Sequence, residues 1–254
     1  MNRLCTIGNY LKWHIFTVIA LVLLGGGSLA YAQNKANTGK WKASSIEDVA
    51  IAFYKTGGVK PGFAKWAKEM DPYLSTAQAR REEVLNEEVL RLRTKYKEYD
   101  SDNDLLLIKT DALIHFDGTK GPQTMRLEFR KGHIDHFPYQ FLDQVIAVIP
   151  HKIQELMVTE VSEEQAEFIR DNTRRTPRKG LMIIELAPKQ ADLTRPHDLD
   201  GTMQWLFLTE VVHLSLWGKG GVRVWEYNNP AYLTAANKEF EDLFTQKRDS
   251  TLKP

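Results

Sequence analysis

Hydrophobic and polar positions recur along this chain with two periods. In the first half of the chain the period is close to that of a helix, and farther on the period is close to two residues. Over residues 75–99, apolar side chains recur at spacings that place them on one helix face. They are Leu85, Val89, Leu92, Tyr96 and Tyr99. Ser75 and Gln78 predict a capping box at the start of this helix. The stripe is shorter than the roughly three or four heptads of a coiled coil, so we expect it to pack on its own domain.

Capping residues mark the boundaries of other helices. Two serines are each followed by glutamate or glutamine at capping-box spacing, which predicts helices that begin directly after them. Gly57 and Gly58 would end the first of these helices, since glycine accepts the left-handed conformation found at helix ends. Asn229 followed by Pro230 predicts the start of a C-terminal amphipathic helix. The two capping pairs are Ser44 with Glu47 and Ser162 with Gln165.

A period of two residues begins near residue 105. Met125, Leu127 and Phe129 alternate with polar residues, which is typical of a strand with one face in water. Two pairs of segments joined by turn-rich loops predict hairpins. The other predicted strands are residues 105–116, 180–186, 202–217 and 222–227, with residues 144–149 as a buried strand or short helix that Pro150 ends.

The order of these elements predicts the fold class. Helices come first, strands dominate later, and no regular β–α–β alternation is present, which favours an α+β fold over a doubly wound one. We therefore expect N-terminal helices packed on a mainly antiparallel β-sheet, with a C-terminal amphipathic helix. Residues 44–247 are expected to form one domain, with a boundary near residues 99–104 as an alternative. Residues 33–43 are expected to be a flexible lead-in, and residues 248–254 a disordered tail.

Residues 1–32 have the three-part layout of a secretory signal peptide. Two basic residues, Arg3 and Lys12, precede an uncharged apolar run, and small side chains follow near the expected cleavage point. We expect a periplasmic or secreted protein. The alternative is an uncleaved anchor through residues 15–32, although a membrane crossing needs roughly 20 apolar residues. The expected signal-peptidase site consists of Ala30, Ala32 and Gln33.

Composition limits the chemistry of the mature chain. Cleavage would remove 32 of the 254 residues and leave enough chain for one sizeable domain. The leader holds two of the 34 basic residues and none of the 33 acidic ones, so 32 basic residues would remain against 33 acidic ones. Such a balance gives no general attraction to nucleic acid or anionic lipid. Cys5 is the only cysteine, so the mature chain would lack disulfides, thiolate metal sites and catalytic thiols.

Histidine and aspartate side chains around the first predicted hairpin are candidate metal ligands. If Phe116 pairs with Gln123, His115 and His133 stand about 30 Å apart along the strands. Ligands of one divalent ion must all lie within about 2–2.5 Å of it. We therefore expect polar strand ends and neither a metal nor another cofactor. The set comprises His115, Asp117, His133, Asp135 and His136.

Aromatic residues in the second predicted hairpin suggest a sugar-stacking platform. With Trp217 opposite Val222, however, Trp225 falls on the other face of the hairpin. Trp205 lies about 40 Å from Trp217 along an unbent strand. We therefore expect these rings to pack in the core and at the sheet edge. The aromatic set comprises Trp205, Trp217, Trp225 and Tyr227.

Four basic residues within six positions form the strongest local candidate for a binding site. The planar guanidinium of arginine binds oxyanions bidentately, so this loop could hold an anionic envelope component or an acidic partner. The other interpretation is a solvated connection between a helix and a strand. The residues are Arg174, Arg175, Arg178 and Lys179.

Sequence motifs of serine, metal-dependent and nucleotide-binding enzymes are absent. Ser215 and His213 would share a strand face, but no neighbouring acid is positioned with them. The leading interpretation is an exported, non-enzymatic binding or envelope-associated protein. The alternative is a hydrolase that acts on cell-wall or other extracellular polymers through carboxylates or histidines. Four carboxylates without a spacing that marks an acid/base pair are Glu163, Glu164, Glu185 and Glu210.

Overall fold

The computed structural model describes residues 42–118, 120–129, 135–175 and 177–232. The predicted signal peptide with Ala30, Ala32 and Gln33, nearly all of the lead-in and the predicted tail lie outside the described residues. Ala43–Lys219 and the described part of Arg223–Pro254 belong to one compact unit, which holds the sheet and the helices packed on it.

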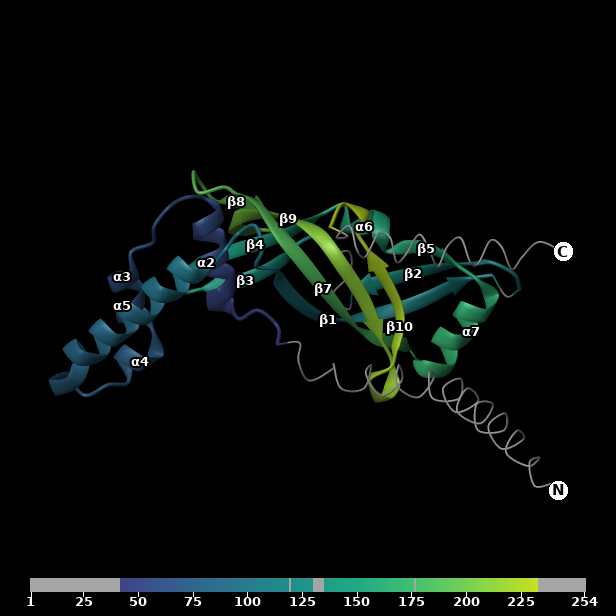
Figure 1. Cartoon of the computed structure of the whole chain (residues 1–254), viewed down its shortest axis with the longest axis horizontal. Coiled ribbons are helices and arrows are strands. Elements are labelled where there is room, and N and C mark those ends of the chain that lie inside the picture. The colour runs from purple at the N-terminus through teal and green to yellow at the C-terminus, as the bar shows by residue number, and fades with distance from the viewer. Residues whose placement is uncertain (1–41, 119, 130–134, 176, 233–254) are drawn as a thin grey trace, which may run out of the picture. The chain divides into compact units, whose positions relative to one another are not determined.

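The described part of the chain contains ten strands that join into one sheet (Figure 1). The strand order is β3-β4-β9-β7-β1-β2-β5, while β8 and β10 also pair with β9, and β6 pairs with β7. The sheet curls into a half-barrel. The strands are β1 (Leu106–Asp117), β2 (Gln123–Phe129), β3 (Phe137–Phe141), β4 (Gln144–His151), β5 (Val158–Val161), β6 (Arg174–Arg175), β7 (Arg178–Ala191), β8 (His197–Leu199), β9 (Thr202–Trp217) and β10 (Arg223–Asn228).

The predicted fold class is wrong about this sheet, which is mixed and not mainly antiparallel. β4 runs parallel to β9, with Ile146 opposite Trp205 at one end of the pairing and His151 opposite Glu210 at the other. Alternation shows which side chains share a face, but it does not show the direction of a partner strand that lies far away in sequence. The predicted C-terminal helix is also not evident. Of its residues, the structure describes only a short 3-10 helix, η3 (Pro230–Tyr232).

Helix α2 (Ile46–Thr56) packs on the sheet against β7, β3 and β4. Five successive residues of this helix, from Val49 to Phe53, are buried, and the Phe53 ring meets Phe207 of β9 edge to face at 5.6 Å. The helix start predicted from Ser44 and Glu47 is one residue off, because Ser45 and Asp48 form the capping box. The Ser44 hydroxyl instead accepts a hydrogen bond from the backbone of β1.

Helix α5 (Arg81–Glu98) has only one fully buried side chain, Leu92, while Leu90 is 67% exposed. It packs against α3 (Phe63–Glu69) and α4 (Asp71–Leu74) (Figure 1). The capping box predicted for Ser75 and Gln78 is wrong, because the Ser75 hydroxyl donates to the Asp71 carbonyl and the α-helix begins after a 3-10 turn, η1 (Gln78–Arg80). The expected packing of this helix on its own chain is confirmed.

Both predicted hairpins are confirmed, with different registers. In β1–β2, Phe116 pairs with Met125 and not with Gln123. In β9–β10, the pairing shifts between Arg223 and Trp225, so that Trp225 lies opposite Leu216. The helix predicted after Ser162 is also present as α7 (Glu163–Asn172), and the Ser162 hydroxyl accepts from the Gln165 backbone. Remaining short helices are α6 (Ile153–Leu156) and η2 (Lys219–Gly221).

Candidate functional site

The candidate site lies where β9 changes its neighbour. One edge of β9 pairs with β7, and the other edge pairs first with β4, over residues 205–210, and then with β10, over residues 213–217. Val211 and Val212 lie between these two partners. The pairing of β9 with β7 also shifts here, since Leu186 pairs with Val211 and Glu185 with His213, which leaves Val212 as the extra residue of a β-bulge. Bulges re-aim side chains and are frequent next to functional sites.

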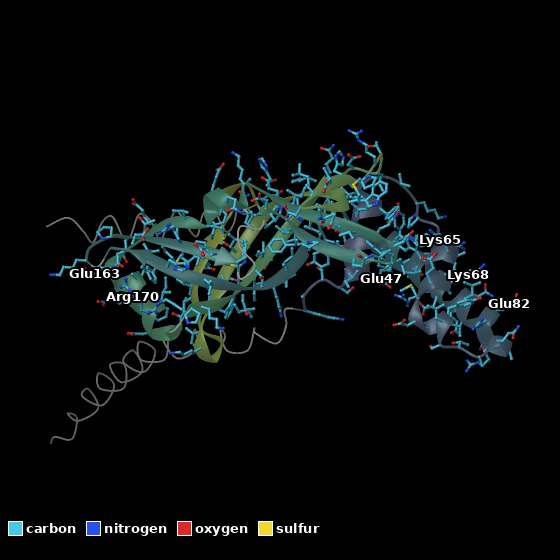
Figure 2. The ribbon with its side chains drawn as sticks, turned by 180° about the vertical axis from the view of Figure 1, so that it is seen from behind. Glu47, Lys65, Lys68, Glu82, Glu163 and Arg170 are labelled. Carbon is cyan, nitrogen blue, oxygen red and sulfur yellow. The ribbon has the colours of Figure 1, made fainter. Side chains whose placement is uncertain are left out.

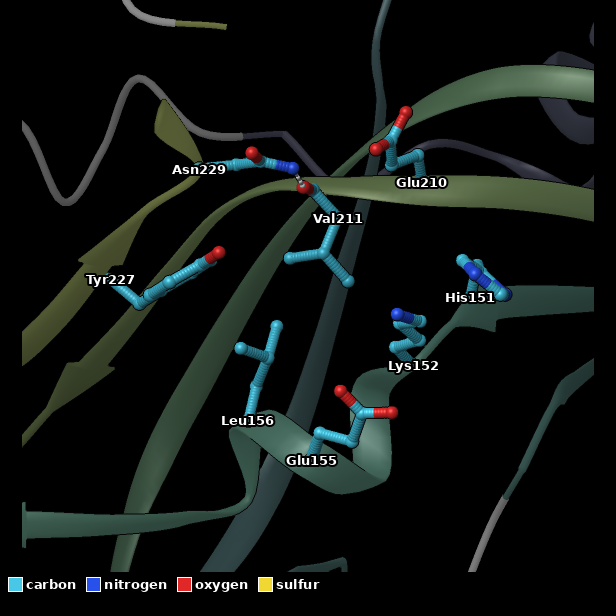
Figure 3. A pocket seen from close by; sticks show the side chains of 8 residues that line it. All are labelled: His151, Lys152, Glu155, Leu156, Glu210, Val211, Tyr227 and Asn229. Atoms are coloured by element: carbon cyan, nitrogen blue, oxygen red, sulfur yellow. Dashed lines mark hydrogen bonds between the residues drawn. The ribbon is translucent and has the colours of Figure 1, made fainter. Parts of the chain in front are cut away.

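Asn229 closes this irregular part of the sheet. Its backbone N–H donates to the Val212 carbonyl at 2.9 Å, and its side-chain amide donates to the Val211 carbonyl at 2.7 Å. The two carbonyls beside the bulge therefore have partners although they lie outside the strand ladder on this edge. A pocket of about 150 Å³ opens beside them (Figure 3). Its polar lining is His151, Lys152, Glu155, Glu210, Tyr227 and Asn229, over an apolar wall of Leu156 and Val211.

Lys152 enters the pocket from a strained position. It links β4 to α6 with φ 58° and ψ 21°, the left-handed conformation that side chains other than glycine rarely adopt. Such a conformation costs roughly 1–3 kcal/mol and is concentrated at functional sites. Figure 3 shows the Lys152 nitrogen and the Glu155 carboxylate on the same side of the pocket. No ion pair joins either charge to the other or to any other described side chain.

Glu210 lies at the rim, and its carboxylate points away from the pocket centre in Figure 3. It accepts a 2.6 Å hydrogen bond from the Tyr232 hydroxyl and forms a 3.3 Å ion pair with Lys189. These two partners lower the pKa of Glu210, the hydroxyl having the larger effect. This carboxylate is therefore held as an anion by its own neighbours, whereas Lys152 and Glu155 keep their charges available to the pocket.

A second polar cluster, whose members lie far apart in the sequence, surrounds His213. Its Nδ1 lies 3.4 Å from Glu185 and its Nε2 lies 3.5 Å from Glu226, while Arg223 contacts Glu226 at 2.6 Å. Burial alone would lower the pKa of His213, but the two carboxylates outweigh burial and raise it to about 9. The imidazole is therefore a cation at neutral pH. A protonated imidazole cannot act as a general base there.

The candidate pair of a serine nucleophile and a histidine base consists of Ser215 and His213. Among the described contacts, no hydrogen bond joins these two side chains. The Ser215 hydroxyl is buried and accepts a 2.9 Å hydrogen bond from the Trp217 indole N–H. The two carboxylates at His213 also occupy opposite ring nitrogens. One metal ion cannot bind both of them and the imidazole, because all ligands of an ion must surround the same point.

The candidate metal ligands do not lie together in the described part of the structure. His115 lies 3.5 Å from Glu128, Asp117 pairs with Arg126, and Asp135 accepts a hydrogen bond from Gln154. His133 lies outside the described residues. Within the described ranges, no group of three or more histidine, cysteine or acidic residues could hold a metal ion.

The aromatic residues weighed as a sugar platform are also separated. Trp217 and Trp225 are buried, Trp205 lies beside Ile146 of β4, and Tyr227 lines the pocket. The acidic residues Glu163 and Glu164 lie in the first turn of α7, where Figure 2 labels Glu163, and neither of them lines the pocket.

The predicted basic loop is a tight hairpin. In β6–β7, Arg174 lies opposite Lys179 and Arg175 opposite Arg178. The Arg178 guanidinium donates to the Arg170 carbonyl at 2.6 Å and to the Thr173 hydroxyl at 2.9 Å. Arg178 therefore attaches the hairpin to the C-terminal end of α7, a role that the charge count in the sequence did not reveal.

No family model matches the chain, and no significant match is found among curated proteins or solved structures. Within the described residues, no helix is both long enough and apolar enough to cross a membrane. The function must therefore be argued from the site geometry.

Proposed function

We propose that this chain is an exported, non-catalytic binding protein that presents the β6–β7 hairpin to an anionic component of the cell envelope. The observation that carries the proposal is the register of the hairpin, which puts basic residues opposite basic residues. Export itself rests on the layout of residues 1–32.

Like charges directly opposite each other destabilise an antiparallel pair. Both cross-strand positions of this hairpin carry such pairs, and residues 173–180 include no acidic residue. A bound anion would relieve the repulsion and would be held by charge-assisted hydrogen bonds. Lys179 has no ion pair with any described side chain, which leaves its charge available to a partner.

Arg178 has a different part in the proposal. Because it is hydrogen-bonded to the end of α7, it fixes the hairpin in place, and removing it would alter the fold as well as the charge. A clean test therefore keeps Arg178 and changes the other three basic residues. The triple variant is Arg174→Ala, Arg175→Ala, Lys179→Ala.

The experiment compares the binding of wild type and variant to vesicles with and without anionic lipid, and to partners captured from envelope extracts. A matched control with the same charge change uses three exposed lysines among the N-terminal helices, Lys60→Ala, Lys68→Ala, Lys97→Ala. We expect the hairpin variant to lose at least about tenfold in affinity for an anionic target, with a shallower salt dependence, and the control to lose little. Equal binding and equal partner lists for both variants would refute the proposal.

The alternative of a hydrolase has less support. Three described histidines lie beside acidic residues in separate places, His115 beside Glu128, His197 beside Asp192 and His213 beside Glu185, and His213 is held as a cation. We expect no turnover of muropeptides or simple esters by the purified protein. Turnover that is abolished by Glu155→Gln would reverse this preference.

A further inference from the structure

We infer that the pocket beside the β9 bulge binds a small aliphatic α-amino acid as a zwitterion, with its ammonium group on Glu155 and its carboxylate on Lys152. This inference concerns a different part of the molecule from the basic hairpin, so it stands or fails independently of the proposed function. It starts from two opposite charges that line one pocket without pairing to each other.

The pocket lining carries one positive and one negative side chain. Lys152 and Glu155 line the same pocket, and neither forms an ion pair with any side chain in the described part of the chain. A ligand that carries one positive and one negative group a short distance apart matches both charges at once. A simple anion or a simple amine would leave one of them without a partner.

The volume of the pocket limits the size of the ligand. A pocket of about 150 Å³ is smaller than typical drug-sized sites of roughly 300–1,000 Å³. A cavity of comparable volume holds a molecule such as benzene, with about six heavy atoms. Alanine also has six atoms other than hydrogen, and it carries the required ammonium and carboxylate groups.

The remaining lining of the pocket combines an apolar wall with a hydroxyl group. Leu156 and Val211 form an apolar wall on which a short aliphatic side chain can rest, while Tyr227 presents its hydroxyl from β10 (Figure 3). Asn229 fixes the backbone carbonyls of the bulge and so keeps this wall in place.

The backbone of Lys152 is strained. Its positive φ places a lysine where glycine would be the unstrained choice. Backbone strain of this kind is concentrated at functional sites. The substitution Lys152→Gly removes the ammonium group and relieves the strain, so a loss of binding cannot be attributed to a loss of folding.

The test is calorimetric titration of the protein, purified after expression of the full-length chain, with L-alanine as the probe. Propionate and ethylamine, which each retain one charge, serve as the two single-charge probes. We expect alanine to bind at least about tenfold more tightly than either one. Propionate or ethylamine binding as tightly as alanine, or no alanine binding up to about 10 mM, would overturn the inference.

Variants then locate the site. Lys152→Gly and Glu155→Gln are each expected to raise the Kd for alanine at least about tenfold, and Lys152→Gly is expected to keep or raise the Tm. The matched controls are the exposed residues Lys60→Gly and Glu164→Gln, which do not line the pocket and should keep wild-type affinity. Unchanged affinity in Lys152→Gly with an unchanged or higher Tm would also refute the inference.

Discussion

Two charge networks hold distant parts of this chain together, and they differ in the source of their positive charge. The helix network joins the first turn of α2 to α5 and consists of Glu47, Asp48, Arg91 and Lys95. The sheet network joins β7, β9 and β10 and consists of Glu185, His213, Glu226 and Arg223. Both satisfy polar groups that are partly removed from water.

The helix network is built on permanent cations. Glu47, which is labelled in Figure 2, is 14% exposed. It accepts two 2.7 Å hydrogen bonds from the Arg91 guanidinium and a third from Lys95. Burial alone would raise the pKa of Glu47, but the two cations outweigh burial and lower it. Arginine and lysine remain charged throughout the pH range in which proteins are stable.

The sheet network is built on a conditional cation. His213 is 12% exposed, and it keeps its proton at neutral pH only because Glu185 and Glu226 lie on either side. In the helix network the charges exist before the contacts form, whereas in the sheet network the contacts with the two carboxylates create the charge of His213, beside the permanent charge of Arg223. The two networks should therefore respond differently to substitution and in opposite directions to pH.

The largest expected effect is that of His213→Ala. It would remove the cation that lies between Glu185 and Glu226, and Glu226 alone would keep a cationic partner, Arg223, among the described ion pairs. We expect a loss of about 2–4 kcal/mol in the free energy of unfolding. Urea denaturation at pH 7 measures this loss.

The matched control is His115→Ala. His115 also contacts a carboxylate, Glu128, but its side chain is 47% exposed. An exposed pair of this kind contributes at most about 0.5–1 kcal/mol. If both variants lost the same stability, burial of the sheet network would not explain its importance.

Local sequence patterns predicted much of the fold that surrounds these networks. The starts of α2 and α7, the apolar stripe of α5 and both hairpins follow from capping residues and periodicity. The start of α2 is one residue later than predicted, and α5 begins only at Arg81, because each predicted capping serine forms a different hydrogen bond. Ser44 is bonded to β1, and Ser75 to the turn before it, so neither caps its helix.

Long-range partners could not be predicted in the same way. Arg91 and Glu87 have the spacing of a helix pair, but Arg91 contacts Glu88 and Glu47 instead. Glu47 is 44 residues away from Arg91, and Glu185 is 28 residues away from His213. Only the pairing of strands and helices decides which of many charged residues meet.

The candidate pocket was beyond sequence reasoning for a related reason. It depends on the parallel pairing of β4 with β9 and on the extra residue at Val212, and neither feature alters the alternation of apolar and polar positions. In the sequence, Lys152 is only a lysine between a predicted strand and a helix, which is too common to mark a site. Its positive φ becomes visible only in the folded chain.

A smaller effect is expected for the corresponding change in the helix network, Glu47→Gln. Arg91 would keep its contact with Glu88, and Lys95 its contact with Asp48, so no cation would be left without a partner. We expect a loss of about 1–2 kcal/mol, measured as a shift of the urea midpoint at pH 7. Glu83→Gln is the control, because Glu83 is 57% exposed and pairs only with exposed Arg80 among the described residues. A larger loss for Glu47→Gln than for His213→Ala would invert the ranking of the two networks.

The most discriminating effect is the dependence of stability on pH. The folded pKa of His213 is raised from 6.5 to about 9, so the folded state binds the proton more tightly and stability falls as pH rises through this window. Between pH 8 and pH 9 the loss from this group is about 1 kcal/mol. The pKa of Glu47 is lowered, so its contribution is lost in acid, as pH falls through its folded value. Urea midpoints measured across both limbs should show a flattened alkaline limb in His213→Gln and a flattened acid limb in Glu47→Gln. An alkaline limb that persists unchanged in His213→Gln would show that the sheet network does not hold its proton by this contact.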